Sequence, residues 1–327
     1  MSGGNKQYFR IAVVFLLIVM AGCQKEEQPD KSAYLPFRFL VLAPGSYEDA
    51  SMNQRCFESL QRLSRRLKIQ IDYVENVKSG STRSVITESG SKYNFVLGID
   101  SQTLPTLIDI STANPEIKSA YIGHFPGSFD NLGALNFQTS HHYLAGVIAG
   151  LKTKTGKIGI IVDYLSPQKM EEVNSFIDGA KRVNSRVYCH TSIIKSDERK
   201  LALDAASSMK KFDIDVMFVN CGAAGNDVYR WGKAHKMMTI RSIEDQYSKA
   251  PGWVLTSVIV NYDVIFGHAI EQMLKGQWQG GLQRFGMADK ATELAPLRGA
   301  ITKAQKEIFD EVYREVAGLK GDAIEDK

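Results

Sequence analysis

The chain has 327 residues, of which 44% are hydrophobic and 23% are charged, and its formal net charge is +4. This length predicts about two domains, and the composition is that of an ordinary globular protein rather than a disordered one. No basic stripe with interleaved aromatic residues accompanies the small positive charge, so we expect no nucleic-acid partner.

The first 22 residues predict a secretion signal. Lys6 and Arg10 supply a positive beginning, and residues 11–22 form an uninterrupted apolar core. This core is too short to span a bilayer, because a helical span takes about 20 residues.

The apolar core leads directly into Met20-Ala21-Gly22-Cys23. This stretch resembles a bacterial lipobox, although Met20 is less usual than leucine at the first position. The resemblance implies that Cys23 receives a lipid and becomes the mature N-terminus, so that the folded part is anchored outside the cytoplasmic membrane. A plain signal peptide with an incidental cysteine is the alternative. The polar residues 24–36 predict a flexible tether.

Three further cysteines are present, Cys56, Cys189 and Cys221. Their spacing fits no metal motif, and one disulfide at most can form among them. We expect buried thiols, which behave as small hydrophobic groups.

After the tether, apolar runs alternate with amphipathic stretches. The pattern predicts strands over residues 37–43, 69–74, 94–98, 119–124 and 132–137, helices over 53–67 and 104–113, and a loop and helix over 77–89. Because each crossover helix has to cover one face of a parallel sheet, this alternation predicts a doubly wound α/β lobe.

Residues 140–162 predict a helix, a turn and a strand that join two lobes. Apolar residues stand at helical spacing over 143–151, and alanines and glycines occupy the other positions. These small residues should let the helix approach its neighbours closely. Gly156 is a plausible break, and the β-branched run at 158–162 predicts a buried parallel strand.

The remaining chain continues the alternation. It predicts strands over residues 186–194, 216–220, 238–243 and 253–260, and helices over 169–183, 198–212, 228–235, 263–276 and 303–319. We expect three crossings between the lobes, near Gln138, Val258 and Leu282. The first lobe would then hold residues 37–137 and 259–282, and the second would hold 138–258 and 283–327.

Six stretches in this order carry a family resemblance: DASMNQ at 49–54, YLAGVIAGLKTKTGKIG at 143–159, IDGAK at 177–181, CGAAGN at 221–226, EDQ at 244–246 and VLTS at 254–257. The chain resembles the basic membrane protein family, lipoproteins that include the purine nucleoside receptors of ABC importers. The resemblance covers essentially the whole mature chain. It implies a type I periplasmic-binding-protein fold, with two doubly wound parallel-sheet lobes joined by a hinge over a nucleoside-binding cleft.

The resemblance also implies a ligand-binding first loop. Asp49, Ser51 and Asn53 match the family pattern, whereas Met52 replaces an aromatic residue that stacks on the base. A methionine can cover a ring face with its polarizable sulfur but forms no aromatic pair.

A late loop departs further from the family. Asp245 matches, but Ile243 replaces an aspartate that holds ribose hydroxyls, and Val260 replaces a lysine that faces the sugar. A second aromatic wall would fall at Ile193 or Ile194. Each lost charged hydrogen bond costs about 1.5–3 kcal/mol, so we expect a more apolar cleft with an altered ribose subsite.

Other cleft candidates follow predicted strands. Asp100 and Asp163 stand at carboxyl ends, where the ligands of α/β proteins collect. Gly222 begins a loop of small residues whose backbone amides can meet a polar ligand. Tyr229 is a candidate replacement ring, and His124 faces either the cleft or the loop surface.

The sequence offers no enzymatic site. No serine has a placed histidine partner, and Gly150 and Gly156 are too far apart for a phosphate-binding loop. His141 and His142 would point about 100° apart on a helix, which disfavours a shared metal ion. We therefore expect no enzyme activity, no cofactor and no metal.

Two functions remain open. The first is a membrane-anchored solute-binding lipoprotein that passes a nucleoside or related heterocycle to an ABC permease by closure of its lobes. The second is a family member with a degenerate cleft that serves as a surface regulatory or structural lipoprotein. Met52, Ile243 and Val260 favour the second, and the retained polar residues of the two loops oppose it.

Overall fold

The computed structural model describes residues 37–48, 51–77, 92–124, 127, 129–195 and 198–318. The predicted secretion signal, the tether, Cys23 and Asp49 lie outside these residues, as does most of the predicted loop and helix at 77–89. In the part of the chain that is described, no helix has the length and apolar character needed to cross a membrane.

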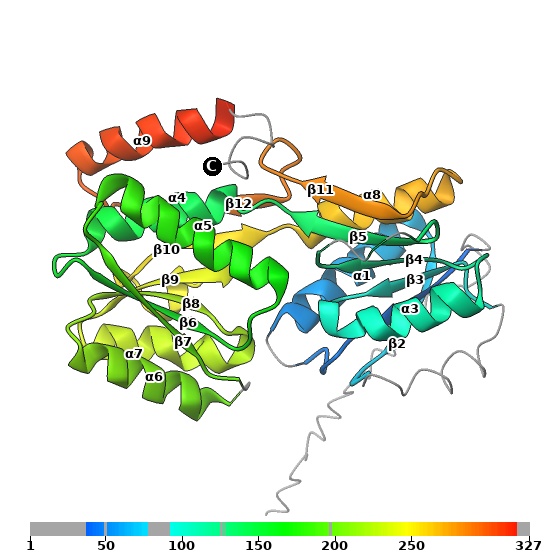
Figure 1. Cartoon of the computed structure of the whole chain (residues 1–327), viewed down its shortest axis with the longest axis horizontal. Coiled ribbons are helices and arrows are strands. Elements are labelled where there is room, and N and C mark those ends of the chain that lie inside the picture. Colours follow the sequence, from blue (N-terminus) through cyan, green and yellow to red (C-terminus); the bar gives the residue numbers. More distant parts are fainter. Residues whose placement is uncertain are drawn as a thin grey trace, which may run out of the picture. The chain divides into compact units, whose positions relative to one another are not determined.

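The first sheet has six parallel strands in the order β11-β5-β4-β3-β1-β2 (Figure 1). Its strands are β1 (Arg38–Leu42), β2 (Gln70–Val74), β3 (Phe95–Gly98), β4 (Lys118–Ile122), β5 (Leu132–Phe137) and β11 (Gly281–Phe285). Helices α1 (Met52–Leu67) and α8 (Tyr262–Leu274) cover one face through Leu60, Leu63 and Phe266. Helix α3 (Leu104–Ala113) and the short η2 (Ser101–Thr103) lie on the other side, where Leu107 and Ile110 join the core.

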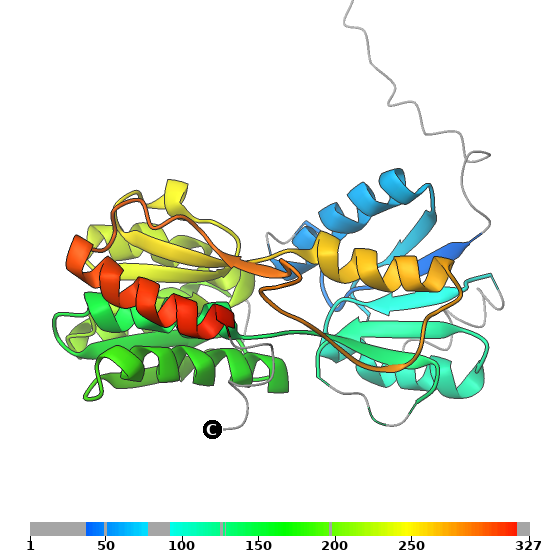
Figure 2. The ribbon, with the colours of Figure 1, turned by 90° about the horizontal axis from the view of Figure 1, so that it is seen from above.

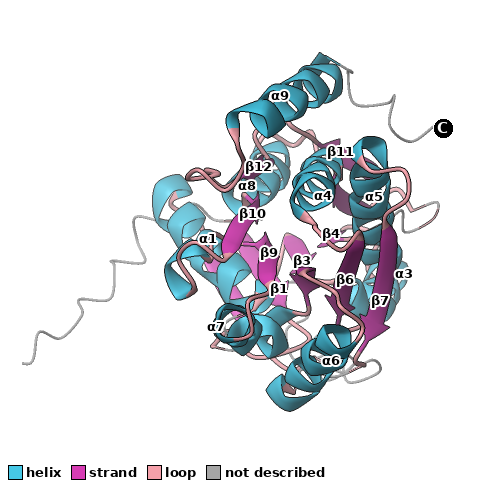
Figure 3. Ribbon diagram, turned by 90° about the vertical axis from the view of Figure 1, so that its left-hand side faces the viewer, coloured by secondary structure: helices cyan, strands magenta, loops and turns pink. Residues whose placement is uncertain are grey.

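The second sheet also has six strands, in the order β12-β10-β9-β8-β6-β7. They are β6 (Lys157–Val162), β7 (Tyr188–Ile193), β8 (Val216–Asn220), β9 (Met238–Ile243), β10 (Val254–Val260) and the antiparallel β12 (Thr292–Leu294). Helices lie on both sides of this sheet (Figure 3). One side carries α4 (Ser140–Lys152), α5 (Pro167–Val183) and α9 (Lys303–Gly318), and α9 lies against α4 (Figure 2). The other carries α6 (Arg199–Lys211), η3 (Gly222–Asp227) and α7 (Val228–Ala234), and η4 (Tyr247–Lys249) precedes β10.

The predicted α/β class with two doubly wound sheets is confirmed, and the predicted strands and helices recur within a few residues of their expected ends. Strands β11 and β12 were not predicted. Strand β11 pairs with β5 as far as Phe285 opposite Phe137. The last connection between the sheets therefore leaves after residue 285 rather than near Leu282.

Helices α4 and α5 pack with their backbones in contact. A Cβ atom on Gly146 would lie 1.9 Å from the carbonyl oxygen of Phe176, and one on Gly179 would lie 1.9 Å from that of Tyr143. The prediction that small residues let the 140–152 helix approach its neighbours closely is confirmed. This contact fixes α5, and with it the residues of the first turns of that helix.

Substitution of Gly146 by alanine should therefore destabilise the fold. The new methyl group would meet backbone, which cannot move aside as a flexible side chain can, so the two helices must separate. We expect Gly146→Ala to lower the free energy of unfolding by about 3 kcal/mol in urea titrations. Gly318→Ala is the matched control, because no described residue lies within 4 Å of its added Cβ. Equal stability of Gly146→Ala and the wild type would contradict this packing argument.

Candidate functional site

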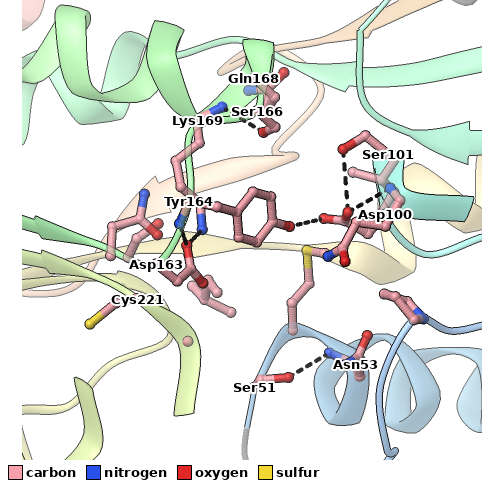
Figure 4. Close-up of a pocket in the computed structure, with 18 of the residues that line it drawn as sticks. Ser51, Asn53, Asp100, Ser101, Asp163, Tyr164, Ser166, Gln168, Lys169 and Cys221 are labelled. Atoms are coloured by element: carbon pink, nitrogen blue, oxygen red, sulfur yellow. Dashed lines mark hydrogen bonds and ion pairs between the residues drawn. The ribbon is translucent and has the colours of Figure 1, made fainter. Parts of the chain in front are cut away.

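A cavity of about 590 Å³ lies between the two sheets, where strands of both lobes end (Figure 4). Asp100 follows β3, Asp163 follows β6 and Cys221 follows β8, and all three line the cavity. Both sheets thus direct the carboxyl ends of parallel strands towards one space, as ligand-binding α/β folds do.

The amino-terminal lobe contributes residues from the start of α1 and from the loop after β3. Ser51 caps α1, and its Oγ accepts a hydrogen bond from the Asn53 amide at 3.1 Å. This cap sets the first turn, so that Met52 and Asn53 line the cavity. The Asp100 carboxylate accepts a hydrogen bond from the Gln102 amide at 2.9 Å, which holds it at the cavity edge.

Five of the predicted ligand-binding residues line this one cavity: Ser51, Met52, Asn53, Asp100 and Gly222. Gly222 adopts a left-handed φ of 49° and faces across to the other lobe, since a Cβ at this position would lie 3.8 Å from the Cβ of Ser51. These five residues therefore come together from both lobes, and their contact with a ligand stays a prediction.

Two other predicted residues are placed elsewhere. Tyr229 is fully buried in the core beside α6, and its hydroxyl accepts a hydrogen bond from Arg241 Nη1 at 2.7 Å. It cannot act as a replacement ring, because a satisfied core residue is not presented to a ligand. Asp245 also lies outside the cavity lining and forms an ion pair of 2.5 Å with Arg298.

The expected second wall is different as well. Ile193 is exposed on the edge strand β7, and Ile194 packs against the core of the second lobe. Lys195, the next residue, is the one that lines the cavity. His124 lies outside the lining, with its ring nitrogen 3.2 Å from the Glu171 carboxylate.

Tyr164 is the most informative lining residue that the sequence analysis missed. Its ring extends from the end of β6 towards the other lobe, and its hydroxyl donates a hydrogen bond of 2.7 Å to Asp100 Oδ2 (Figure 4). The Lys169 ammonium lies 4.6 Å from the ring centre and is paired with Asp163. The position of Tyr164 directly after a candidate strand-end residue, Asp163, was the available signal.

Further polar contacts join the two lobes. Asn136 of β5 donates to the Gln168 side chain, and Gln168 Nε2 donates to the Phe137 carbonyl at 3.1 Å. Arg55 of α1 forms an ion pair with Glu244, which follows β9. The cleft is thus bridged by protein groups at several points.

A buried carboxyl lies at the inner end of the cleft. Glu172 lines the cavity and is 5% exposed, and Asn220 Nδ2 donates a 2.6 Å hydrogen bond to its Oε2. His142, fully buried, lies 3.6 Å from the same oxygen and 3.3 Å from Ser242 Oγ. Burial raises the pKa of Glu172 to about 7 and lowers the pKa of His142 to about 3, so the pair is neutral in mildly acidic solution.

The side of the cleft near β9 and β10 is apolar. Ile243 and Val260 both line the cavity. Ile243 has a φ of 91°, a conformation that β-branched residues rarely adopt and that costs about 1–3 kcal/mol. Backbone strain of this kind is typical of ligand sites.

Histidine, cysteine and acidic side chains are dispersed over the described residues. No group of three histidine, cysteine or acidic side chains gathers there in a way that could hold a metal ion. Cys56 and Cys221 are buried free thiols, as predicted, whereas Cys189 is only half-buried. Burial raises the pKa of Cys221 to about 12, which makes it a poor nucleophile.

A family model and individual relatives both show similarity over most of this chain. A family model described as "ABC transporter substrate-binding protein PnrA-like" matches residues 38–323. A CD4+ T-cell-stimulating antigen of Listeria innocua is 24% identical over 335 residues, covering 91% of this chain and 93% of that protein. An ABC transporter nucleoside-binding protein of Lactococcus lactis is 25% identical over 345 residues, covering 94% and 97%.

A solved structure supports the fold alone. ABC transporter system solute-binding proteins from Aeropyrum pernix match with a TM-score of 0.76 and 16% identity, over 86% of this chain and 92% of that chain.

The buried carboxyl predicts a pH dependence of stability. Because folding raises the pKa of Glu172 from 4.5 to about 7, the folded state keeps a proton that the unfolded chain loses in this window. The contribution of Glu172 to stability is therefore present below pH 4.5 and is lost as the pH rises to 7. Glu172→Gln removes this contribution. The free energy of unfolding of the variant, relative to that of the wild type, should therefore rise by about 1.4 kcal/mol per pH unit between pH 4.5 and 7.

Urea titrations at pH 4.5, 6 and 7.5 measure this difference. Burial also lowers the pKa of His141 to about 4 and that of His142 to about 3, which weakens both proteins below pH 6.5. These histidines are present in both proteins, so their contribution largely cancels in the difference. A difference that stays constant with pH would contradict the raised pKa.

Proposed function

Since the chain belongs to the family of PnrA-like ABC transporter substrate-binding proteins, we propose that it captures a nucleoside-like or related heterocyclic solute in the cleft and delivers it to an ABC permease. The observation that carries this proposal is the convergence of Ser51, Met52, Asn53, Asp100 and Gly222 on one cavity between the lobes. Its volume lies within the range of small-molecule sites.

The chemistry of the lining suits a flat heterocycle with polar edges. Met52, Ile122 and Phe137 offer apolar and aromatic surface for a ring face. Asn53 and Asp100 offer an amide and a carboxylate for ring N–H and carbonyl groups. The nucleoside-binding relative in Lactococcus lactis supports this ligand class.

The proposal includes anchoring to the cell membrane by lipid at Cys23 and an extracytoplasmic location, on the periplasmic or the cell-surface side. It rests on the short apolar core at residues 11–22 and on the Met20–Cys23 stretch. Replacing Cys23 removes the thiol that would carry the lipid. The Cys23→Ser variant should therefore be released from membranes.

Ligand-induced stabilisation tests the proposed function. We expect a raised melting temperature with one or more nucleosides or free bases, and none with amino acids. A ligand at 100 times its dissociation constant should add about 2.7 kcal/mol to the free energy of unfolding. Asp100→Asn, which keeps the size of the side chain, should reduce the shift. No shift with any nucleoside or base, from a folded sample, would overturn the proposal and favour a regulatory or structural lipoprotein.

The bridge across the cleft gives a second prediction. Tyr164→Phe removes the hydrogen bond to Asp100 and keeps the ring. A hydrogen bond to a charged group contributes about 1.5–3 kcal/mol, so the ligand-free variant should populate open conformations about 10- to 100-fold more than the wild type.

Small-angle X-ray scattering without ligand should therefore give a larger radius of gyration for Tyr164→Phe than for the wild type. Tyr313→Phe on α9 is the control, since its side chain is 39% exposed and lies outside the cavity lining. Identical scattering of Tyr164→Phe and the wild type would show that this contact does not hold the lobes together.

A further inference from the structure

Strand β7 lies at an outer edge of the second sheet, beside β6 (Figure 3), and in the described part of the chain no strand pairs with its other side. The amides of Tyr188 and Ile194 donate inward, towards β6. Because backbone groups alternate along a strand, the N–H and C=O groups of Cys189, Thr191 and Ile193 point outward. This edge can therefore accept another strand.

The composition of β7 does not block such pairing. Edge strands are commonly protected by charged side chains or proline. The other three edge strands of the described sheets carry a charge, since β2 contains Asp72, β11 contains Arg284 and β12 contains Glu293. Strand β7 reads YCHTSI and contains no lysine, arginine, aspartate, glutamate or proline.

Exposed apolar side chains gather along the same edge. Eight large hydrophobic side chains are exposed in the described chain, and four of them belong to β7, to α6 or to the residue after α6: Tyr188 (59%), Ile193, Leu201 and Phe212 (61%). The centre of the Phe212 ring lies 6.4 Å from that of His190 in β7. Leu201 lies in the first turn of α6, which follows the far end of the strand. Exposed apolar patches on a soluble protein mark interaction sites.

A second copy of β7 fits this edge when it runs antiparallel, with a two-fold axis at Thr191. Thr191 then faces its own counterpart, and Cys189 faces Ile193 of the second copy. All outward backbone groups of both strands form hydrogen bonds in this register. Threonine pairs and apolar pairs across neighbouring strands stabilise a sheet. The strand is therefore complementary to itself.

The charges at the two ends of the edge also match in this arrangement. Asp213 follows Phe212, and its side chain is 80% exposed, although it lies 3.9 Å from Lys157. Lys195 and Lys200 are exposed and follow the opposite end of β7. Antiparallel pairing brings the carboxylate end of one copy to the lysine end of the other, which favours association.

We propose that the chain forms a two-fold homodimer through β7, in which the six-stranded sheets of the two second lobes join into one continuous sheet. The dimer covers the exposed apolar side chains and leaves no free edge at β7. This inference does not depend on the solute in the cleft, so its failure would leave the proposed function intact.

Disulfide cross-linking of the full chain tests the register. Facing residues of an antiparallel pair have Cα atoms about 4.5–5.5 Å apart, which a disulfide can span. In Ile193→Cys the new thiol would face the native Cys189 of the second copy, so we expect a covalent dimer on a non-reducing gel after oxidation with copper phenanthroline. The wild type and Ser248→Cys, which adds an exposed thiol in η4, should cross-link at least about tenfold less.

Sedimentation velocity of the full chain in mild detergent measures the association. We expect a concentration-dependent dimer between about 1 and 100 μM. Thr191→Pro removes an outward N–H and no bond to β6, so it should keep the melting temperature and raise the dissociation constant about tenfold or more. Phe212→Ser should weaken the dimer to a similar extent. Ile308→Ser on α9 is the matched control, since Ile308 is 44% exposed and lies outside this edge.

Three outcomes would overturn the proposal. The first is a chain that stays monomeric at about 100 μM and gives no cross-link in Ile193→Cys. The second is a dimer that Thr191→Pro and Phe212→Ser leave intact, because another surface then holds it. The third is equal cross-linking of Ile193→Cys, Ser248→Cys and the wild type, which indicates random collision. If Thr191→Pro fails to fold, Phe212→Ser decides the question, because it changes only an exposed side chain.

Discussion

The backbone contact between α4 and α5 is the constraint on which the cleft depends. Gly146 and Gly179 let the two helices touch at their main chains. The first turns of α5 then bring Gln168 and Glu172 to the cavity, while His142 of α4 lies beside Glu172. A helix pair held apart by side chains would withdraw both polar residues from the cleft. The same glycines that determine packing therefore also determine which groups a ligand can meet.

Most of the fold was predictable because its elements have strong local patterns. Buried parallel strands are short β-branched runs, and the crossover helices are amphipathic. Strands β11 and β12 were not predicted because they are short edge strands with few buried residues. Strand β11 is defined by pairing with β5, about 150 residues earlier in the chain, and no local pattern records such a partner.

The site was predictable in part, and the failures have a common cause. Asp100 was found because it follows a strand, where the ligands of parallel α/β sheets collect, whereas Ser51 was found through the resemblance of its loop to the family's first loop. Tyr229 was wrongly placed because burial and its contact with Arg241 depend on tertiary packing. Glu172, in contrast, lines the cavity but was not predicted. A glutamate in a helix indicates a solvated face, and only the packing of α5 on α4 shows that this one is buried.

Most polar side chains of the cleft form hydrogen bonds or ion pairs with one another. These contacts determine how much free energy a ligand gains by binding to the same groups. Tyr164 donates to Asp100, and Lys169 pairs with Asp163. A ligand that takes over these groups gains only the difference between its own hydrogen bonds and those it replaces. Tyr262 also lines the cavity, and its hydroxyl is different, because nothing in the described chain has to be displaced from it. Groups left unpaired by the protein contribute their full hydrogen bond to a matching ligand, and they discriminate most strongly against an analogue that lacks the partner.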